Sequence, residues 1–81
     1  MSTELHETLA MMILSENVRA LRTERGLTQD ELARAIGIAH SRISEIEKKR
    51  GNPTLSTIEK LADFFGVSAG YLIDGRKTAQ N

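Results

Sequence analysis

Residues 29–46 read QDELARAIGIAHSRISEI, and this segment carries the strongest fold signal in the chain. The order of its small, apolar and polar residues predicts two short helices that meet at a tight angle. Ala33 stands where only a small side chain lets the second helix approach closely, and Gly37 gives the turn a residue that tolerates positive φ. The buried side of the second helix is expected to consist of Ile38, Ile43 and Ile46.

Length and composition predict one compact domain, because the chain has 81 residues of which 40% are hydrophobic. There is no cysteine, so neither a disulfide framework nor a cysteine-based zinc site is available. Nothing resembles a secretory leader or a membrane span, and we therefore expect a cytoplasmic protein with no membrane partner. We also expect no cofactor, no metal site and no small-molecule ligand.

Charge is balanced overall but unevenly distributed, since 11 Lys plus Arg residues face 11 Asp plus Glu residues. Residues 1–16 contain no Lys or Arg, and their acidic residues are Glu4, Glu7 and Glu16. The basic residues around the second half of the motif are Arg42, Lys48, Lys49 and Arg50. A basic face on a neutral molecule is an electrostatic footprint for a polyanion, and an ordinary solvated charge run is the alternative interpretation.

Glycines fall where the apolar helical periodicity lapses, and this pattern predicts an all-α fold of five short helices. The first helix is expected to carry Val18 and Leu21 on one face. It should run to about Arg25 and stop at Gly26 in the left-handed conformation.

The second and third helices form the motif quoted above. Thr28 and Glu31 have the spacing of a capping box, so the second helix should begin at Gln29. The third helix is expected from about His40 to Lys48.

The fourth helix follows the loop at residues 50–53 and is capped by Thr54 or by Ser56, both of which remain open. It should end at Gly66. A last short helix, capped by Ser68, is expected to end at Gly75 and to be followed by a flexible tail at residues 76–81.

These segments resemble the helix-turn-helix domain of the phage-repressor and Cro class, the XRE-type family. The runs LTQDELARAIGI, ISEIE, NPTLSTIEKLADFFGVS and YLIDG stand in the order and spacing of that family between residues 17 and 75. The resemblance implies a compact five-helix domain like that of lambda repressor, with residues 1–16 as an N-terminal extension. It also implies a homodimer that binds an inverted-repeat operator in double-stranded DNA and regulates transcription, as a repressor or autoregulator.

The first residues of the third helix are the candidates for reading DNA bases, because a helix in the major groove reaches base edges with its N-terminal residues first. With Ile43 and Ile46 turned to the core, the outer face and its margin carry His40, Ser41, Arg42, Ser44 and Glu45. For Glu45, the alternative is a solvated ion pair with Lys48 or Lys49. For Arg42, the resemblance leaves a phosphate contact as the alternative to reading guanine.

A second set of residues is expected to contact phosphates, which fix the register without reading sequence. Gln29 is the strongest candidate, because it opens a helix where free amides and the dipole favour an anion. The other candidates follow the third helix and are Lys48, Lys49, Arg50 and Asn52.

The resemblance assigns one structural pair and one departure from the family pattern. Arg22 and Glu47 occupy positions that commonly form a partly buried ion pair linking the first helix to the end of the third. Ala39 stands where a Ser or Thr often caps the third helix, and the missing cap typically costs about 1 kcal/mol.

Dimer contacts are expected mainly near the end of the domain, at Tyr71, Leu72 and Ile73. Residues 1–16 have an apolar stripe at helical spacing, formed by Leu5, Leu9, Met12 and Ile13. That stripe either packs on the same domain, by extending the first helix or adding an arm, or contacts a second copy. A loosely ordered segment ahead of a start near Met11 or Met12 is a third possibility.

Two other functions stay open, an antitoxin that binds both operator and toxin, and a protein-interaction adaptor that keeps the fold without binding DNA. Enzymatic activity is not expected. His6 and His40 are far apart in sequence, and no Ser-His-Asp or metal-ligand spacing occurs.

Overall fold

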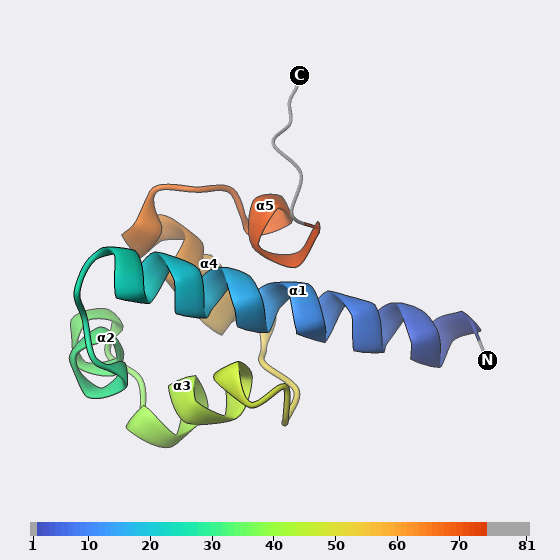
Figure 1. The fold of residues 1–81 in the computed structure, drawn as a ribbon, viewed down its shortest axis with the longest axis horizontal. Helices are drawn as coiled ribbons and strands as arrows, with labels where there is room; N and C mark the ends of the chain where they lie inside the picture. The colour runs from blue at the N-terminus through green and yellow to red at the C-terminus, as the bar shows by residue number, and fades with distance from the viewer. Residues whose placement is uncertain (1, 75–81) are drawn as a thin grey trace.

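A computed structural model describes residues 2–74, with side chains from residue 9 onward. This part of the chain folds into five α-helices and contains no strand, which confirms the all-α prediction (Figure 1). The helices are α1 (Ser2–Glu24), α2 (Gln29–Ile36), α3 (His40–Glu47), α4 (Leu55–Phe65) and α5 (Ala69–Asp74). Among the described residues, no helix is long and apolar enough to cross a membrane. Gly75 and the tail at residues 76–81 lie outside the described part.

The core lies where α1 crosses the other helices. This long helix packs against α3 on one side and α5 on the other, while α2 packs against α3 (Figure 1). Every helix contributes at least one buried apolar side chain, so the five helices share one hydrophobic core. The buried apolar residues are Leu14, Val18, Leu32, Ala33, Ile43, Ile46, Leu61, Ala62, Phe65 and Leu72.

The start of α2 has the predicted capping box. The amide of Glu31 donates to the Thr28 hydroxyl at 3.0 Å, and the amide of Thr28 donates to the Glu31 carboxylate at 2.9 Å. The helix ends at Gly37, whose φ of 74° lies in the left-handed region. Ala33, at 1% exposure, sits in the close contact between α2 and α3 that its small side chain permits.

The start of α4 resolves the choice between two caps. The hydroxyl of Thr54 accepts a hydrogen bond from the Thr57 amide, and Ser56 lies within the first turn instead. The end of α4 at Gly66 and the Ser68 contact to the Tyr71 amide both agree with the sequence prediction.

The first helix is much longer than the domain core requires. The sequence from Ser2 to Glu24 has no glycine or proline to stop it, and α1 runs through this whole range without a break. The expected division between residues 16 and 17 therefore falls inside a helix. Leu14 and Ser15, on the extension side of that division, are buried at 1% and 2% exposure.

Candidate nucleic-acid interface

The orientation of α3 follows from its apolar residues. Ile43 and Ile46 are buried, at 0% and 2% exposure, and the period of the helix turns the intervening positions outward. The base-reading candidates lie on that outward side. His40, Ser41, Arg42 and Glu45 are exposed, and Ser44 is half-buried.

The N-terminus of α3 has no side-chain cap, as the sequence predicted from Ala39. This residue takes the extended conformation of an N-cap, with φ −69° and ψ 142°, but a methyl group cannot accept a hydrogen bond. No acidic residue lies in the first turn either. The amides at the exposed tip of α3 and the positive end of its dipole are therefore open to an anion from outside the chain.

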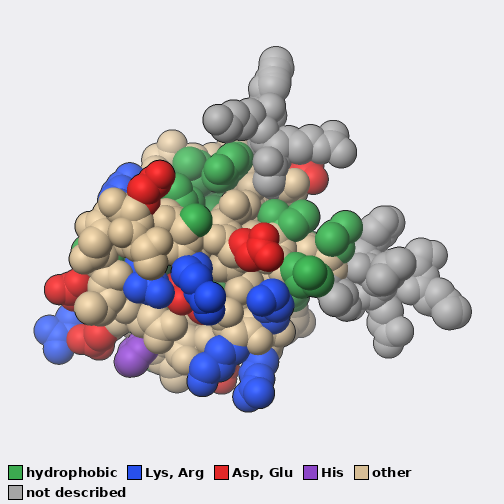
Figure 2. Space-filling model, in the orientation of Figure 1, with side chains coloured by type: hydrophobic (Ala, Val, Ile, Leu, Met, Phe, Trp, Pro, Cys, Tyr) green, Lys and Arg blue, Asp and Glu red, His purple; other side chains and the backbone are tan. Residues whose placement is uncertain are grey.

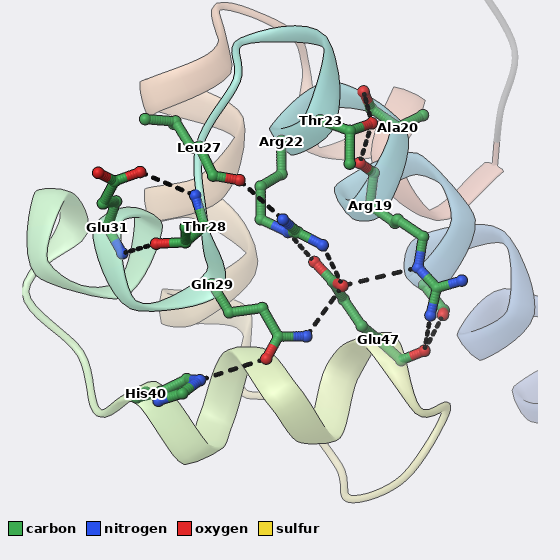
Figure 3. Close-up of polar contacts among 11 residues, drawn as sticks. Arg19, Ala20, Arg22, Thr23, Leu27, Thr28, Gln29, Glu31, His40 and Glu47 are labelled. Atoms are coloured by element: carbon green, nitrogen blue, oxygen red, sulfur yellow. Dashed lines mark hydrogen bonds and ion pairs between the residues drawn. The ribbon is translucent and has the colours of Figure 1, made fainter.

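The opposite end of α3 is held firmly by Glu47, whose side chain is 1% exposed. The ion pair expected between Arg22 and Glu47 is present and bidentate, with Nε to Oε2 at 2.6 Å and Nη2 to Oε1 at 2.9 Å (Figure 3). Arg22 also donates to the Leu27 carbonyl at 2.7 Å. One guanidinium thus joins α1, the turn before α2 and the end of α3.

The ionisation of Glu47 reflects two opposing effects. Burial alone would raise the pKa of its carboxyl group. Hydrogen bonds from Arg22 and Gln29, together with the positive charges of Arg22 and Arg19, outweigh burial and hold this pKa below its ordinary value of 4.5. The hydrogen bond to Glu47 likewise raises the pKa of Arg22. The pair is charged at neutral pH.

Gln29 connects this buried pair to the tip of α3. Its Nε2 donates to Oε1 of Glu47 at 3.1 Å, and its Oε1 lies 3.2 Å from Nε2 of His40 (Figure 3). The Glu47 carboxylate can only accept hydrogen bonds, so the amide nitrogen of Gln29 must face it. The amide oxygen of Gln29 therefore points toward the imidazole of His40. The sequence suggested a phosphate contact for Gln29 and gave no sign of this bridge.

The basic candidates lie in the α3–α4 loop, residues 48–54. Lys48, Lys49 and Arg50 are exposed, and Figure 2 shows Lys and Arg side chains gathered around α3 and the middle of α1. The loop bends sharply, because Lys49 has a φ of 62° and the Arg50 amide donates to the Glu45 carbonyl at 2.8 Å. The bend turns the chain back toward α3.

An open pocket of about 370 Å³ lies between α3 and this loop. It brings together candidates from both predicted classes, base-reading and phosphate-contacting. Its polar lining includes Ser41, Arg42, Glu45, Arg50 and Asn52.

Comparison with known proteins independently supports the assignment of a helix-turn-helix domain. The helix-turn-helix family matches residues 18–72. A hypothetical transcription factor from Neisseria meningitidis serogroup B is 43% identical over 61 residues, which cover 75% of this chain and 58% of that protein. The cryptic phage CTXphi transcriptional repressor RstR of Vibrio cholerae is 39% identical over 66 residues, covering 82% of this chain and 60% of that protein.

A solved structure agrees with these relatives. The crystal structure of the hypothetical transcription factor NHTF from Neisseria matches with a TM-score of 0.73 at 41% identity, covering 78% of this chain and 72% of that one. The chain belongs to the XRE-type helix-turn-helix family. It spans about three-fifths of the length of the two relatives described above. Of these two relatives, one is a hypothetical transcription factor and the other a transcriptional repressor.

Within this helix-turn-helix domain, the expected dimer residues separate into three environments. Ile73 is exposed and Tyr71 is half-buried. The expectation for Leu72 is wrong, because its side chain is 0% exposed and belongs to the monomer core. Helical periodicity explains the difference, since three consecutive positions on a helix point in three directions and only one can face the core fully.

Two residues that hold α3 were missed by sequence reasoning. Ser15 donates to the Glu47 carbonyl at 2.8 Å from a buried position, and Arg19 approaches the same oxygen at 3.4 Å. The only available signal was a serine inside an otherwise apolar helix face. Among the described residues, no group of three or more His, Cys, Asp or Glu is placed to hold a metal ion.

Proposed function

We propose that this chain is a sequence-specific DNA-binding regulator, acting as a repressor or autoregulator, that binds an inverted-repeat operator as a homodimer. The observation that carries the proposal is the contrast between the two ends of α3. Its C-terminal end is locked by Arg22 and Glu47, while its polar tip is exposed and uncapped. A rigid helix with an exposed, uncapped polar tip suits insertion into the major groove.

Base reading is assigned to the outward side of α3. Arg42 has the donor fork that matches guanine, and the Glu45 carboxylate accepts from a cytosine amine. The hydroxyl groups and the imidazole donate or accept according to the base they meet. The full set is His40, Ser41, Arg42, Ser44 and Glu45.

Phosphate contacts are assigned to the α3–α4 loop and to the start of α2. The exposed cations of the loop supply charge, and each phosphate that they neutralise adds about −0.9 to the slope of log affinity against log salt. Gln29 lies at the first position of α2, beside the amides of its first turn. The full set is Gln29, Lys48, Lys49, Arg50 and Asn52.

Selection from random duplex DNA is the primary test, because it reports binding, half-site sequence and half-site spacing together. We expect an inverted repeat whose half-sites are one helical turn apart, roughly 34–36 Å. If no sequence is enriched at low salt, the result would favour a protein-interaction adaptor that keeps the fold without binding DNA. Enrichment of a single half-site would retain DNA reading but remove the homodimer.

The division of roles is tested on the selected operator and its single-base variants. Arg42→Ala and Glu45→Ala should change the ranking of the variants, whereas Lys48→Ala should weaken all of them about equally and flatten the salt slope by roughly 0.9. Lys60→Ala is the matched control, because Lys60 is an exposed cation on α4 outside both sets. If Arg42→Ala, Glu45→Ala and Lys48→Ala all weakened binding equally across the operator variants, the division into base-reading and phosphate-contacting residues would be contradicted.

A further inference from the structure

An apolar groove adjoins the surface proposed to face DNA and shares Lys49 and Asn52 with the phosphate-contacting set. The groove has a volume of about 540 Å³ and runs between the N-terminal half of α1, the α3–α4 loop, α4 and the end of α5. Its apolar lining includes Met11, Met12, Leu14, Pro53, Ile58 and Ile73.

Large apolar side chains also stand out from the surface around this groove. Leu9 is 52% exposed, Met12 40% and Ile73 38%. Figure 2 shows hydrophobic side chains gathered on the surface at this end of the molecule. The same helix therefore supplies both a protruding leucine and a wall of the groove. A combined knob and hole on one surface is what a self-complementary contact requires.

The first turns of α1 extend beyond the other helices (Figure 1). Most helix stability in proteins comes from packing an amphipathic face. An apolar contact along the N-terminal half of α1 would therefore stabilise this helix.

The groove's position favours a second copy of the chain as its occupant. Asn52 and Pro53 line both the groove and the pocket of the DNA-facing surface, so the groove adjoins the end of α3. A two-fold contact there would bring the ends of two α3 helices together. Both exposed tips would then lie on one side of the pair, as an inverted repeat demands.

Charge supports the same occupant. The first 16 residues contain Glu4, Glu7 and Glu16 with no Lys or Arg, whereas Lys49 lines the groove. A second α1 approaching the groove would bring an acidic segment toward the Lys49 ammonium group. The chain's own C-terminal residues, GRKTAQN at 75–81, are polar and basic and do not suit an apolar groove.

We propose that α1 is the dimerisation helix of this protein, and that Leu9 and Met12 of each copy pack into the groove of the other beside Ile73. This inference rests on the homodimer of the proposed function and assigns its surface. It moves the main contact from the end of the domain to the N-terminal half of α1.

The test measures the oligomeric state of the full chain by sedimentation equilibrium, without DNA. Leu9→Glu and Met12→Glu should raise the dimer dissociation constant by about tenfold or more, because each places a charge in the apolar contact. Leu55→Glu is the matched control and should leave it unchanged, since Leu55 is 65% exposed and lies outside the groove. Circular dichroism verifies that each variant keeps its helix content.

Cross-linking gives a second measurement that does not depend on destabilising the contact. The chain has no cysteine, so Leu9→Cys and Leu55→Cys each introduce a single thiol. A short bis-maleimide should join two copies of Leu9→Cys efficiently and two copies of Leu55→Cys poorly.

The outcomes separate this inference from the proposed function. A wild-type dimer that persists in both glutamate variants, with equal cross-linking of both cysteine variants, would overturn the assigned surface while leaving operator binding intact. A wild-type chain that stays monomeric at high concentration would overturn the inference outright. Loss of operator binding in a chain that dimerises through Leu9 would instead contradict the proposed function.

Discussion

The two helices of the motif have the same length, eight residues each, but are stabilised in different ways. Both ends of α2 are closed by its own neighbours in sequence, Thr28 and Glu31 at the start and Gly37 at the end. The start of α3 has no side-chain cap and only an exposed contact between His40 and Gln29, whereas its end is held by groups on α1 and α2. A helix fixed mainly at one end by buried tertiary contacts can leave the backbone amides at its other end open to a ligand.

The largest effect is expected where α3 depends on α1. Arg22→Ala removes one partner of a buried ion pair and leaves the Glu47 carboxylate without its main counter-charge, so we expect a loss of about 3–5 kcal/mol in unfolding free energy. Urea denaturation measures it. Arg34→Ala is the control, because Arg34 is 80% exposed in its pair with Asp30 and should cost no more than about 0.5 kcal/mol. Equal losses would contradict a special dependence of α3 on this contact.

A smaller effect is expected from acid, which discharges Glu47 but leaves it able to hydrogen-bond. The folded pKa of Glu47 lies below its unfolded value of 4.5, so its contribution is fully present above pH 4.5 and is lost as pH falls through the folded pKa. Wild type should therefore be more stable than Glu47→Gln at pH 7, and the difference should shrink below pH 4.5. Urea titrations at several pH values measure the difference in unfolding free energy between the two proteins. The contributions of the other carboxyl groups cancel in this difference, because both proteins contain them. A difference that stays constant with pH would be inconsistent with this account.

The local stabilisation of α2 should be worth less than the tertiary anchor of α3. Thr28→Ala removes the capping hydroxyl and should lower the unfolding free energy by about 1 kcal/mol. Ser56→Ala is the matched control, because Ser56 is exposed inside α4 and Thr54 is the cap there. The control should change stability by no more than about 0.5 kcal/mol. A Thr28→Ala loss as large as that of Arg22→Ala would remove the contrast between the two helices.

The smallest effect concerns the missing cap of α3. Ala39→Ser supplies a hydroxyl where the backbone already has N-cap geometry, so stability should rise by about 0.5–1 kcal/mol. Ala35→Ser, on the exposed side of α2, should instead lower it by up to about 0.5 kcal/mol, because serine is the poorer helix former. Thermal unfolding of wild type and the two variants gives the sign of each change in stability. A loss in Ala39→Ser would mean that α3 starts elsewhere.

Local signals in the sequence predicted most of the fold. The capping box at Thr28, the left-handed glycines and the helical spacing of apolar residues act over only a few positions, so they can be recognised without the fold. The same reasoning placed Ile43 and Ile46 inside and His40, Ser41, Arg42 and Glu45 outside, and the structure agrees. The Arg22–Glu47 pair came only from resemblance to the family.

Sequence patterns alone predicted five helices, the capping box of α2 and the polar side of α3, because each depends on neighbours within one or two helical turns. The folded arrangement was needed to choose Thr54 over Ser56 as the cap of α4, and to show which long-range partners hold α3 and which apolar residues remain exposed. Ser15, Arg19 and Gln29 reach Glu47 across 18 to 32 positions of sequence, a separation at which local patterns carry no information. Leu72 is buried and Leu9 exposed for a similar reason, since burial depends on which helices pack across α1 and where that packing ends.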